Sequence, residues 1–264
     1  MKLDINSKVK LNDGTQMPLL GFGTWQIRNG ESAYNAVLWA LKAGYRHIDT
    51  AKFYGNEESV GRAIRDSGIP RSDVFVTTKL WPTDAINAEK VFNRSFEKLD
   101  IGYIDLYLMH WPVPGMVKKS WQRLEKIYET SGKIKSIGVS NHNIRQLKCI
   151  LDVAKIKPVV NQVKCSPYNY DPTMHEFCRK NDIVMEAYSP LTRGNMLYDE
   201  KLTTIAEKYK KSSTQILLRW CIQKGIVTIP KSAHPEWITE NADIFDFEIS
   251  DDDMRKLDNF SKNV

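Results

Sequence analysis

No stretch of this 264-residue chain approaches the ~18 consecutive apolar residues that a membrane-spanning helix requires. The first six residues also lack the apolar core of a secretory signal. No linker, low-complexity stretch or sequence repeat divides the chain. We therefore expect one domain over residues 1–264, in the reducing cytoplasm and without a membrane partner. No metal site is expected either, because no CxxC pair or zinc-binding spacing occurs among Cys149, Cys165, Cys178 and Cys221.

The charges contain no long block of one sign, although 38 basic residues against 32 acidic ones give a net charge of +6. Such an excess suggests a nucleic-acid partner as one alternative. However, lysines alternate with acids along helical segments, as in Glu200–Lys201 and Glu207–Lys208, which is typical of solvated helix faces. We therefore expect no nucleic-acid partner, and a phosphorylated cofactor could use part of the excess. No large apolar stripe marks an interface, so we expect a monomer.

The chain does contain eight short runs of β-branched and apolar residues, each of which ends at a polar or reactive side chain. Helix-sized segments separate the runs, and this alternation predicts βα units around a parallel sheet. Eight such units over ~250 residues predict a closed (β/α)8 TIM barrel of the α/β class, with its chemistry at the strand ends. The runs end at Thr24, Asp49, Lys79, His110, Ser140, Gln162, Tyr188 and Lys231.

The segments between the runs are predicted helices, and glycine follows several of them, as expected of a helix stop. Asp13-Gly14 predicts an N-terminal β-hairpin that covers one mouth of the barrel. Two additional C-terminal helices are predicted, with Ser250 as an N-cap. The predicted helices are Glu31–Ala43, Asn56–Ser67, Ala85–Leu99, Trp121–Ser131, Asn143–Val153, Pro172–Asn181, Glu200–Tyr209, Ser213–Lys224, Pro235–Ala242 and Ser250–Phe260.

Four polar residues could carry out one reaction together. Asp49 and Lys79 end neighbouring strands, where each favours the charged form of the other. Tyr54 lies five residues beyond Asp49 and could reach over Lys79, whose charge lowers the pKa of a phenol. We therefore expect Tyr54 to exchange a proton with a substrate oxygen near neutral pH, while His110 orients that oxygen. Packing explains each residue alone, but their combination on one barrel rim favours catalysis.

Large aromatic residues lie just beyond several of the same strand ends. Plain core packing would explain some of the seven tryptophans of the chain. Their position in loops on one face of the predicted barrel instead favours the walls of an apolar substrate pocket. The predicted wall residues are Trp25, Phe53, Trp81 and Trp111.

Over almost its full length the chain resembles the aldo-keto reductase family. The stretch Gly44–Glu57, which contains Asp49 and Tyr54, is similar to the first signature of that family, and Leu106–Pro112 and Ile137–Asn141 are similar to its middle signatures. Ile229–Ser232, followed by Glu240-Asn241, is similar to the last one. The short segment between Trp111 and Trp121 is typical of compact microbial members, such as diketogluconate and glyoxal reductases.

The resemblance implies a (β/α)8 barrel that binds a nicotinamide cofactor, NADPH or NADP, without a GxGxxG fingerprint. It implies that Asp49, Tyr54, Lys79 and His110 are catalytic, and that Trp25, Tyr54, Trp81, His110 and Trp111 bind a small carbonyl substrate. It further implies a set of cofactor contacts. These are Gly23, Thr24 and Asp49 at the first strands, Ser140, Asn141, Gln162 and Tyr188 at the nicotinamide, Ser189 and Leu191 at the pyrophosphate, and Lys231, Ser232, Trp237, Glu240 and Asn241 at the adenosine 2′-phosphate and adenine.

The chain departs from the family pattern six residues after Lys231, where Trp237 stands in place of the usual arginine. A tryptophan can stack on adenine but cannot form a charge-assisted pair with a phosphate. We therefore expect weaker discrimination for NADPH over NADH than is usual, with Lys231 as the main remaining anchor.

Three interpretations follow. The first is an oxidoreductase that reversibly reduces an aldehyde or ketone to the alcohol with NAD(P)H, with the proton supplied by Tyr54. The second is an aldolase that forms a Schiff base on Lys79, which pairing with Asp49 disfavours by keeping the amine protonated. The third is a non-catalytic barrel that senses the cofactor. The physiological substrate, the direction of the reaction and the oligomeric state stay open.

Overall fold

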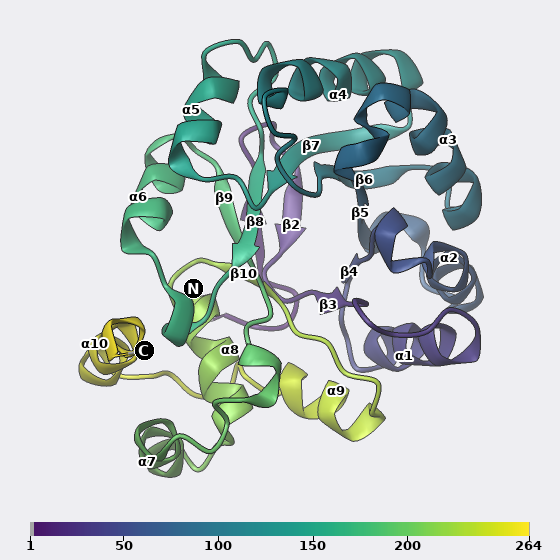
Figure 1. Ribbon diagram of the computed structural model, residues 1–264. Helices are drawn as coiled ribbons and strands as arrows, with labels where there is room; N and C mark the ends of the chain where they lie inside the picture. Colours follow the sequence, from purple (N-terminus) through teal and green to yellow (C-terminus); the bar gives the residue numbers. More distant parts are fainter. Residues whose placement is uncertain (1–2, 264) are drawn as a thin grey trace.

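Eight parallel strands lie side by side in chain order from β3 (Phe22–Gly23) to β10 (Val227–Ile229) in a computed structural model that describes residues 3–263 (Figure 1). Hydrogen bonds between the first and last of them close the ring: the Gly21 amide donates to the Thr228 carbonyl at 2.9 Å, and the Thr228 amide donates to the Leu19 carbonyl at 2.9 Å. The predicted barrel is therefore confirmed. The strands between are β4 (His47–Asp49), β5 (Phe75–Leu80), β6 (Ile104–Met109), β7 (Ile134–Ser140), β8 (Val160–Lys164) and β9 (Val184–Tyr188).

Helices surround the ring of strands and cover its outer face (Figure 1). Their apolar stripes meet the outward residues of the strands, and Trp121 and Trp220 are fully buried in this layer. The helices are α1 (Glu31–Lys42), α2 (Glu57–Asp66), α3 (Ala88–Leu99), α4 (Val117–Ser131), α5 (Ile144–Leu151), α6 (Pro172–Lys180), α7 (Glu200–Tyr209), α8 (Ser213–Gln223), α9 (Pro235–Ala242) and α10 (Asp251–Asp258).

All ten predicted helices are present, and eight of them begin within one residue of the expected start. Helix α4 begins at Val117, four residues before the predicted start, and Val117 packs against the core one turn before Trp121. Helix α3 begins at Ala88, because a 3₁₀ segment (Pro82–Asn87) precedes it. The predicted N-cap is confirmed, since the Ser250 hydroxyl accepts a hydrogen bond from the Asp253 amide.

The predicted N-terminal hairpin pairs β1 (Lys8–Lys10) with β2 (Gln16–Pro18) in antiparallel register. Its turn is anchored to the barrel, because Asp13 accepts a hydrogen bond from the Ser136 hydroxyl at 2.6 Å and Asn12 donates to the Pro158 carbonyl at 3.0 Å. These partners lie near the amino ends of β7 and β8. The hairpin therefore covers that mouth of the barrel, and the carboxyl ends of the strands form the other mouth. Within residues 3–263, no helix is long and apolar enough to span a bilayer.

Candidate active site

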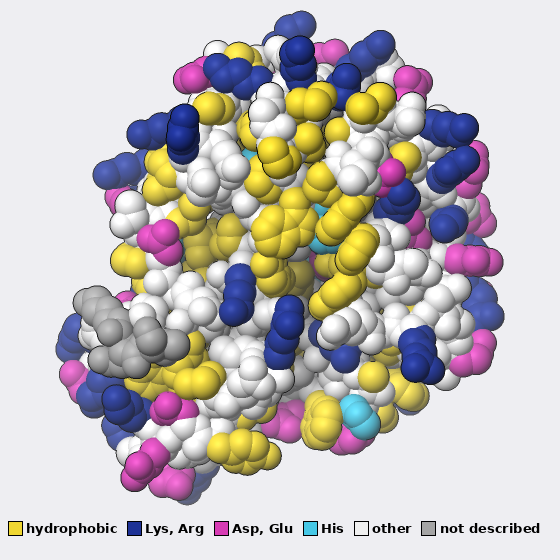
Figure 2. All heavy atoms as spheres, viewed as in Figure 1, with side chains coloured by type: hydrophobic (Ala, Val, Ile, Leu, Met, Phe, Trp, Pro, Cys, Tyr) yellow, Lys and Arg dark blue, Asp and Glu magenta, His cyan; other side chains and the backbone are white. Residues whose placement is uncertain are grey.

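A cavity of about 920 Å³ opens at the carboxyl ends of the strands. This size is within the range of small-molecule and cofactor sites. The space-filling view down the barrel shows a hollow at the centre of this face with hydrophobic side chains gathered around it (Figure 2). One end of the cavity is lined by aromatic side chains and the other mainly by hydroxyl, amide and charged groups.

Beneath the aromatic end, the four predicted catalytic residues lie together. The Lys79 amine on β5 donates hydrogen bonds to Asp49 Oδ1 at 2.6 Å, to the Thr50 carbonyl at 2.8 Å and to the Tyr54 hydroxyl at 3.1 Å. Asp49 at the end of β4 is 1% exposed, and Lys79 is fully buried. Adjacent parallel strands bring these residues together, because Asp49 pairs with Thr77, two residues before Lys79.

A 3₁₀ turn (Lys52–Tyr54) directs Tyr54 back over β5, and Gly55 ends this turn with a left-handed backbone at φ 70°. The predicted contact with Lys79 is confirmed, but the predicted fall in the pKa of Tyr54 is wrong. Burial raises the pKa of this phenol to about 12, although the charge of Lys79 acts in the opposite direction. The cost of placing a phenolate in a dry site exceeds the attraction of one cation that Asp49 already neutralises. Tyr54 therefore keeps its proton at neutral pH.

Lys79 and Asp49 form a tight buried pair. Burial lowers the pKa of Lys79, but Asp49 and Tyr54 outweigh it, so the net direction is upward. Burial raises the pKa of Asp49 against the opposing effects of Lys79 and Gln162. A protonated, fully buried amine is a poor nucleophile, and this geometry disfavours the Schiff-base aldolase.

His110 follows β6, and its ring lies edge-on to Tyr54 with 5.6 Å between centroids. Burial, followed by the charge of Lys79, lowers the pKa of His110 to about 3. The imidazole is therefore neutral at physiological pH, and it can donate one hydrogen bond to a substrate oxygen without adding charge.

Three aromatic rings form a continuous wall beside Tyr54. Trp25 stacks on Phe53 with 5.6 Å between centroids, and Phe53 stacks on Trp81 at 3.9 Å with 10° between planes. Phe53 is 49% exposed and Trp111 is 44% exposed, so the wall remains accessible. The arrangement suits an apolar or flat substrate, as the sequence predicted.

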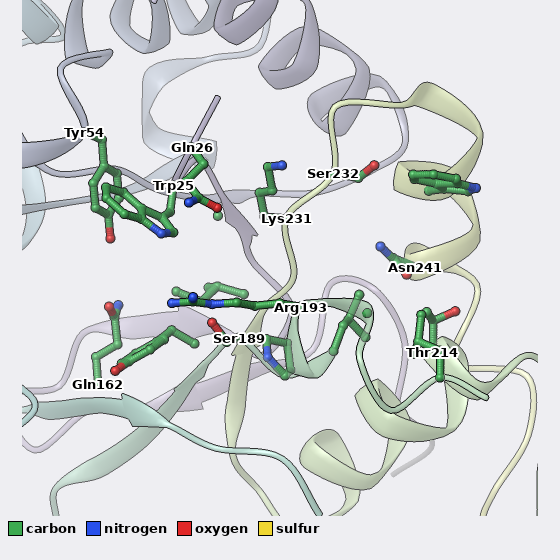
Figure 3. A pocket seen from close by; sticks show the side chains of 18 of the residues that line it. Trp25, Gln26, Tyr54, Gln162, Ser189, Arg193, Thr214, Lys231, Ser232 and Asn241 are labelled. Carbon is green, nitrogen blue, oxygen red and sulfur yellow. The ribbon is translucent and has the colours of Figure 1, made fainter. Parts of the chain in front are cut away.

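The close-up in Figure 3 shows how the labelled side chains divide along the cavity. Tyr54 and Gln162 lie at one end, whereas Ser232 and Asn241 lie at the other. Lys231 and Arg193 lie between these ends (Figure 3), and among the described residues neither forms an ion pair.

The structure brings most predicted site residues to this cavity. Those that line it are Gly23, Trp25, Tyr54, Trp81, His110, Trp111, Ser140, Asn141, Gln162, Tyr188, Ser189, Leu191, Lys231, Ser232, Trp237, Glu240 and Asn241. Asp49 and Lys79 lie beneath the cavity wall, where they contact Tyr54 and Gln162 instead. Thr24 is not on the wall either: it is fully buried, and its hydroxyl donates to the Asp49 carbonyl at 3.0 Å. Thr24 therefore supports the end of β4 and does not face the cavity.

Polar groups at the ends of β7 and β9 hold one another in place. The Tyr188 hydroxyl donates to Asn141 Oδ1 at 2.8 Å, and Asn141 Nδ2 donates to the His110 carbonyl at 3.0 Å. Asn141 and Ser189 both have left-handed backbones, at φ 61° and 50°. Non-glycine residues in this conformation are uncommon and concentrate at functional sites. The rings and amides at this end are therefore preorganised.

Sequence reasoning missed several lining residues, of which Arg193 is the most notable. It lies in a 3₁₀ segment (Thr192–Gly194) with a left-handed backbone at φ 57°. No motif identified it, because it follows the predicted Ser189 and Leu191 in a loop whose shape the sequence does not fix. Thr214 on α8 was missed for the same reason: α8 reaches the polar end of the cavity only through the tertiary fold (Figure 3).

Trp237 on α9 lines the polar end and is 53% exposed. Its ring lies 4.3 Å from the ring of His234. Glu240 accepts hydrogen bonds from the hydroxyls of Ser212 and Thr214, which fixes its carboxylate against the start of α8. Within residues 3–263, no group of His, Cys, Asp and Glu side chains could hold a metal ion.

Comparisons with known proteins agree with this geometry. The sequence model of the Aldo/keto reductase family matches residues 19–262. The chain is 45% identical over 265 residues to glyoxal reductase of Bacillus subtilis (strain 168), with 100% of this chain and 96% of that protein covered. It is 40% identical over 253 residues to methylglyoxal reductase DkgA of Escherichia coli (strain K12), covering 94% and 91%. A crystal structure of an aldo/keto reductase from Brucella melitensis superposes with a TM-score of 0.91 at 47% identity, covering 96% and 99%. This chain belongs to the aldo/keto reductase family.

Proposed function

We propose that this protein reduces an aldehyde or ketone to the alcohol with a nicotinamide cofactor as hydride donor. The observation that carries the proposal is the buried line of contacts from Asp49 through Lys79 to the Tyr54 hydroxyl, which ends at the aromatic wall of the cavity. It is supported by membership of the family and by two relatives whose names describe carbonyl reduction.

The proposed roles follow from the charges. Tyr54 keeps its proton at neutral pH and donates it to the carbonyl oxygen as negative charge develops there. Lys79 holds the Tyr54 hydroxyl at 3.1 Å and stabilises the phenolate that remains. Asp49 keeps Lys79 charged, and neutral His110 orients the carbonyl. The stacked wall of Trp25, Phe53 and Trp81 binds the remainder of the substrate.

The residues present fit a dinucleotide. The cavity is elongated, with an aromatic and amide end, two cations without acidic partners among the described residues, and a hydroxyl-rich end (Figure 3). We place the nicotinamide against Tyr188, with Ser140, Asn141 and Gln162 beside it. Arg193 would then lie beside the pyrophosphate between the two ends, and Lys231 would pair with the 2′-phosphate of NADPH. When bound, the nicotinamide supplies the hydride. Ser189 and Leu191 would line the pyrophosphate, and the adenosine would lie among Ser232, Trp237, Glu240 and Asn241.

Cofactor preference depends on Trp237. An indole offers a face for adenine and no positive charge for a 2′-phosphate. We therefore propose that NADH is used alongside NADPH, with Lys231 as the residue that retains some preference for NADPH.

The substrate class that we propose is small aldehydes and dicarbonyls, including aromatic ones. Arg193 is the only arginine that lines the cavity among the described residues, and the aromatic end contains no acidic lining residue. Polyhydroxylated sugars would find few hydrogen-bond partners on the wall of Trp25, Phe53 and Trp81.

Localisation in the cytoplasm and a monomeric state stay predictions, which fractionation and analytical ultracentrifugation would check.

The first experiment follows absorbance at 340 nm with methylglyoxal or an aromatic aldehyde, with NADPH and NADH separately. Tyr54→Phe is the matched control, because it removes one hydroxyl and leaves the ring in its tilted contact with Trp25 and its edge-to-face contact with His110. We expect Tyr54→Phe to lower kcat by roughly 10²–10⁴-fold while cofactor binding persists. Cofactor binding without turnover of any carbonyl by the unmodified protein would contradict the proposal and favour a cofactor sensor.

A further inference from the structure

The barrel interior contains a second carboxylate that the roles above do not use. Glu186 on β9 is fully buried and is the register partner of Gln162 on β8. A fully buried glutamate is rare unless it is paired or hydrogen-bonded. Its position beneath a cavity-lining residue suggests that it acts on the site rather than on the outer packing.

Gln162 connects this carboxylate to the catalytic residues. Its side-chain nitrogen donates one hydrogen bond to Asp49 Oδ2 and another to Glu186 Oε2, both at 2.9 Å. The two hydrogens of the amide are thereby used by two acceptors. The carbonyl oxygen of Gln162 is then the group left for the cavity, where it can accept from a ligand amide.

Among residues 3–263, only one cation faces the two carboxylates. Lys79 on β5 is bonded to Asp49. His47 on β4 lies 3.7 Å from Glu186 Oε1, but burial and then Lys79 lower the pKa of His47 to about 3, so it is neutral. Val227, the register partner on β10, adds no charge. Tyr54, the remaining titratable group nearby, keeps its proton.

The fold makes room for this arrangement. A Cβ atom at Gly21, just before β3, would lie 2.4 Å from His47 Nδ1, so a larger residue at this position would displace the imidazole that borders Glu186. His47 is held on its other side by Thr77 Oγ1 at 3.1 Å. Glycine at position 21 therefore keeps a polar layer of side chains beneath the active site, inside a barrel whose outer layer is apolar.

We propose that Glu186 is a positioning residue for the reduction proposed above. Glu186 holds the Gln162 amide so that the carbonyl oxygen of Gln162 points toward the nicotinamide. Because Glu186 is protonated, Asp49 is the sole charged partner of Lys79. This inference rests on the proposed function. Burial, and then the charge of Asp49, raise the pKa of Glu186 to about 8. Ionised Glu186 in turn raises the pKa of Tyr54 and weakens it as a proton donor.

Two substitutions separate the two parts of this role. Glu186→Gln keeps an oxygen acceptor for Gln162 and cannot ionise, whereas Glu186→Leu keeps the volume and removes the acceptor. Glu125→Gln is the control, because Glu125 on α4 is also buried and bonded to two backbone amides, but it lies in the outer layer. For each protein we would measure kcat and the cofactor Kd from pH 6 to pH 10, and the carboxylic-acid C=O infrared band at pH 7.

In the unmodified protein and in Glu125→Gln we expect kcat for reduction to fall through an inflection near pH 8. Glu186→Gln should keep kcat within about threefold at pH 6.5, lose the inflection and lose one carboxylic-acid band. Glu186→Leu should weaken cofactor binding by roughly 2–13-fold, which is the range of one net hydrogen bond of ~0.5–1.5 kcal/mol.

An inflection near pH 8 that survives in Glu186→Gln, or an infrared band that does not change, would overturn the proposal. So would cofactor binding by Glu186→Leu equal to that of the unmodified protein. If Glu186→Leu does not fold, the pH profile and infrared band of Glu186→Gln decide. The infrared band and the cofactor Kd require no turnover, so a failure of the proposed carbonyl reduction would remain distinguishable from a failure of the Glu186 role.

Discussion

Replacement of Lys79 by methionine tests the charge balance beneath the active site. Methionine retains most of the apolar volume of lysine but removes the amine that bonds Asp49 at 2.6 Å and Tyr54 at 3.1 Å. Asp49 is 1% exposed and then has no cation beside it. Removal of one partner from a buried ion pair typically costs 3–5 kcal/mol, because the other charge stays buried without compensation.

The structure sets an upper limit on this cost. In the folded variant Asp49 can bind a proton and become neutral, whereas the unfolded chain releases this proton above the ordinary Asp pKa of 3.8. At pH 7 the solution lies roughly 3 pH units above that pKa, and each unit costs ~1.36 kcal/mol, so the free energy of proton uptake is about 4 kcal/mol. At pH 5 it spans roughly 1 pH unit, and the cost falls to about 2 kcal/mol. The unfolded state binds fewer protons than the folded variant in this range, so stability declines as pH rises.

Urea denaturation followed by circular dichroism at pH 5 and pH 7 measures both values. The double variant Asp49→Asn/Lys79→Met removes both charges, and we expect it to recover most of the lost stability and to lose the pH dependence of the loss. Glu176→Gln is a surface control, because the pair of Glu176 with Arg179 is 44% and 69% exposed and should contribute little to stability. Equal destabilisation of Lys79→Met at both pH values, or no recovery in the double variant, would refute the assignment of Asp49 as the charged partner.

Two further predictions concern the cofactor and the histidine. Trp237→Arg places a cation at the polar end of the cavity. We expect it to lower the KM for NADPH by about tenfold or more with little change for NADH, because a charge-assisted hydrogen bond is worth ~1.5–3 kcal/mol. An equal effect on both cofactors would contradict the role given to Trp237. His110 stays neutral above its pKa of about 3, so kcat/KM measured from pH 4.5 to pH 7 should show no inflection near pH 6.5. An inflection in kcat/KM near pH 6.5 that disappears in His110→Gln would refute this protonation state.

The sequence predicted the strand ends well, because period, length and terminal residues carry independent signals. Asp49, Lys79 and His110 each follow an apolar run, and parallel strands place such ends at one mouth of a barrel. The helix starts were less accurate. The beginning of α4 at Val117 was missed, because two lysines separate Val117 from the stronger apolar pattern that starts at Trp121.

Residues that reach the site through long-range packing could not be predicted. Arg193 lines the cavity because of three left-handed residues in one loop, Ser189, Thr192 and Arg193 itself, and none of them is glycine. A non-glycine residue in this conformation has no reliable sequence signal. Glu186 was hidden differently: it lies in the middle of a buried strand, so its polar partners come from strands far away in the chain.

The pKa of Tyr54 shows most clearly what a sequence can and cannot supply. The motif places a lysine beside the phenol, and a rule about neighbouring charges then predicts a lower pKa. The structure adds that Asp49 already neutralises Lys79 and that burial is the larger effect, which raises the pKa to about 12. A phenol that holds its proton this strongly is ready to donate near pH 7, whereas the reverse oxidation requires the phenolate. The buried layer of Asp49, Lys79 and Glu186 therefore favours reduction at physiological pH. We expect alcohol oxidation to become efficient only as the pH approaches the pKa of the Tyr54 phenol.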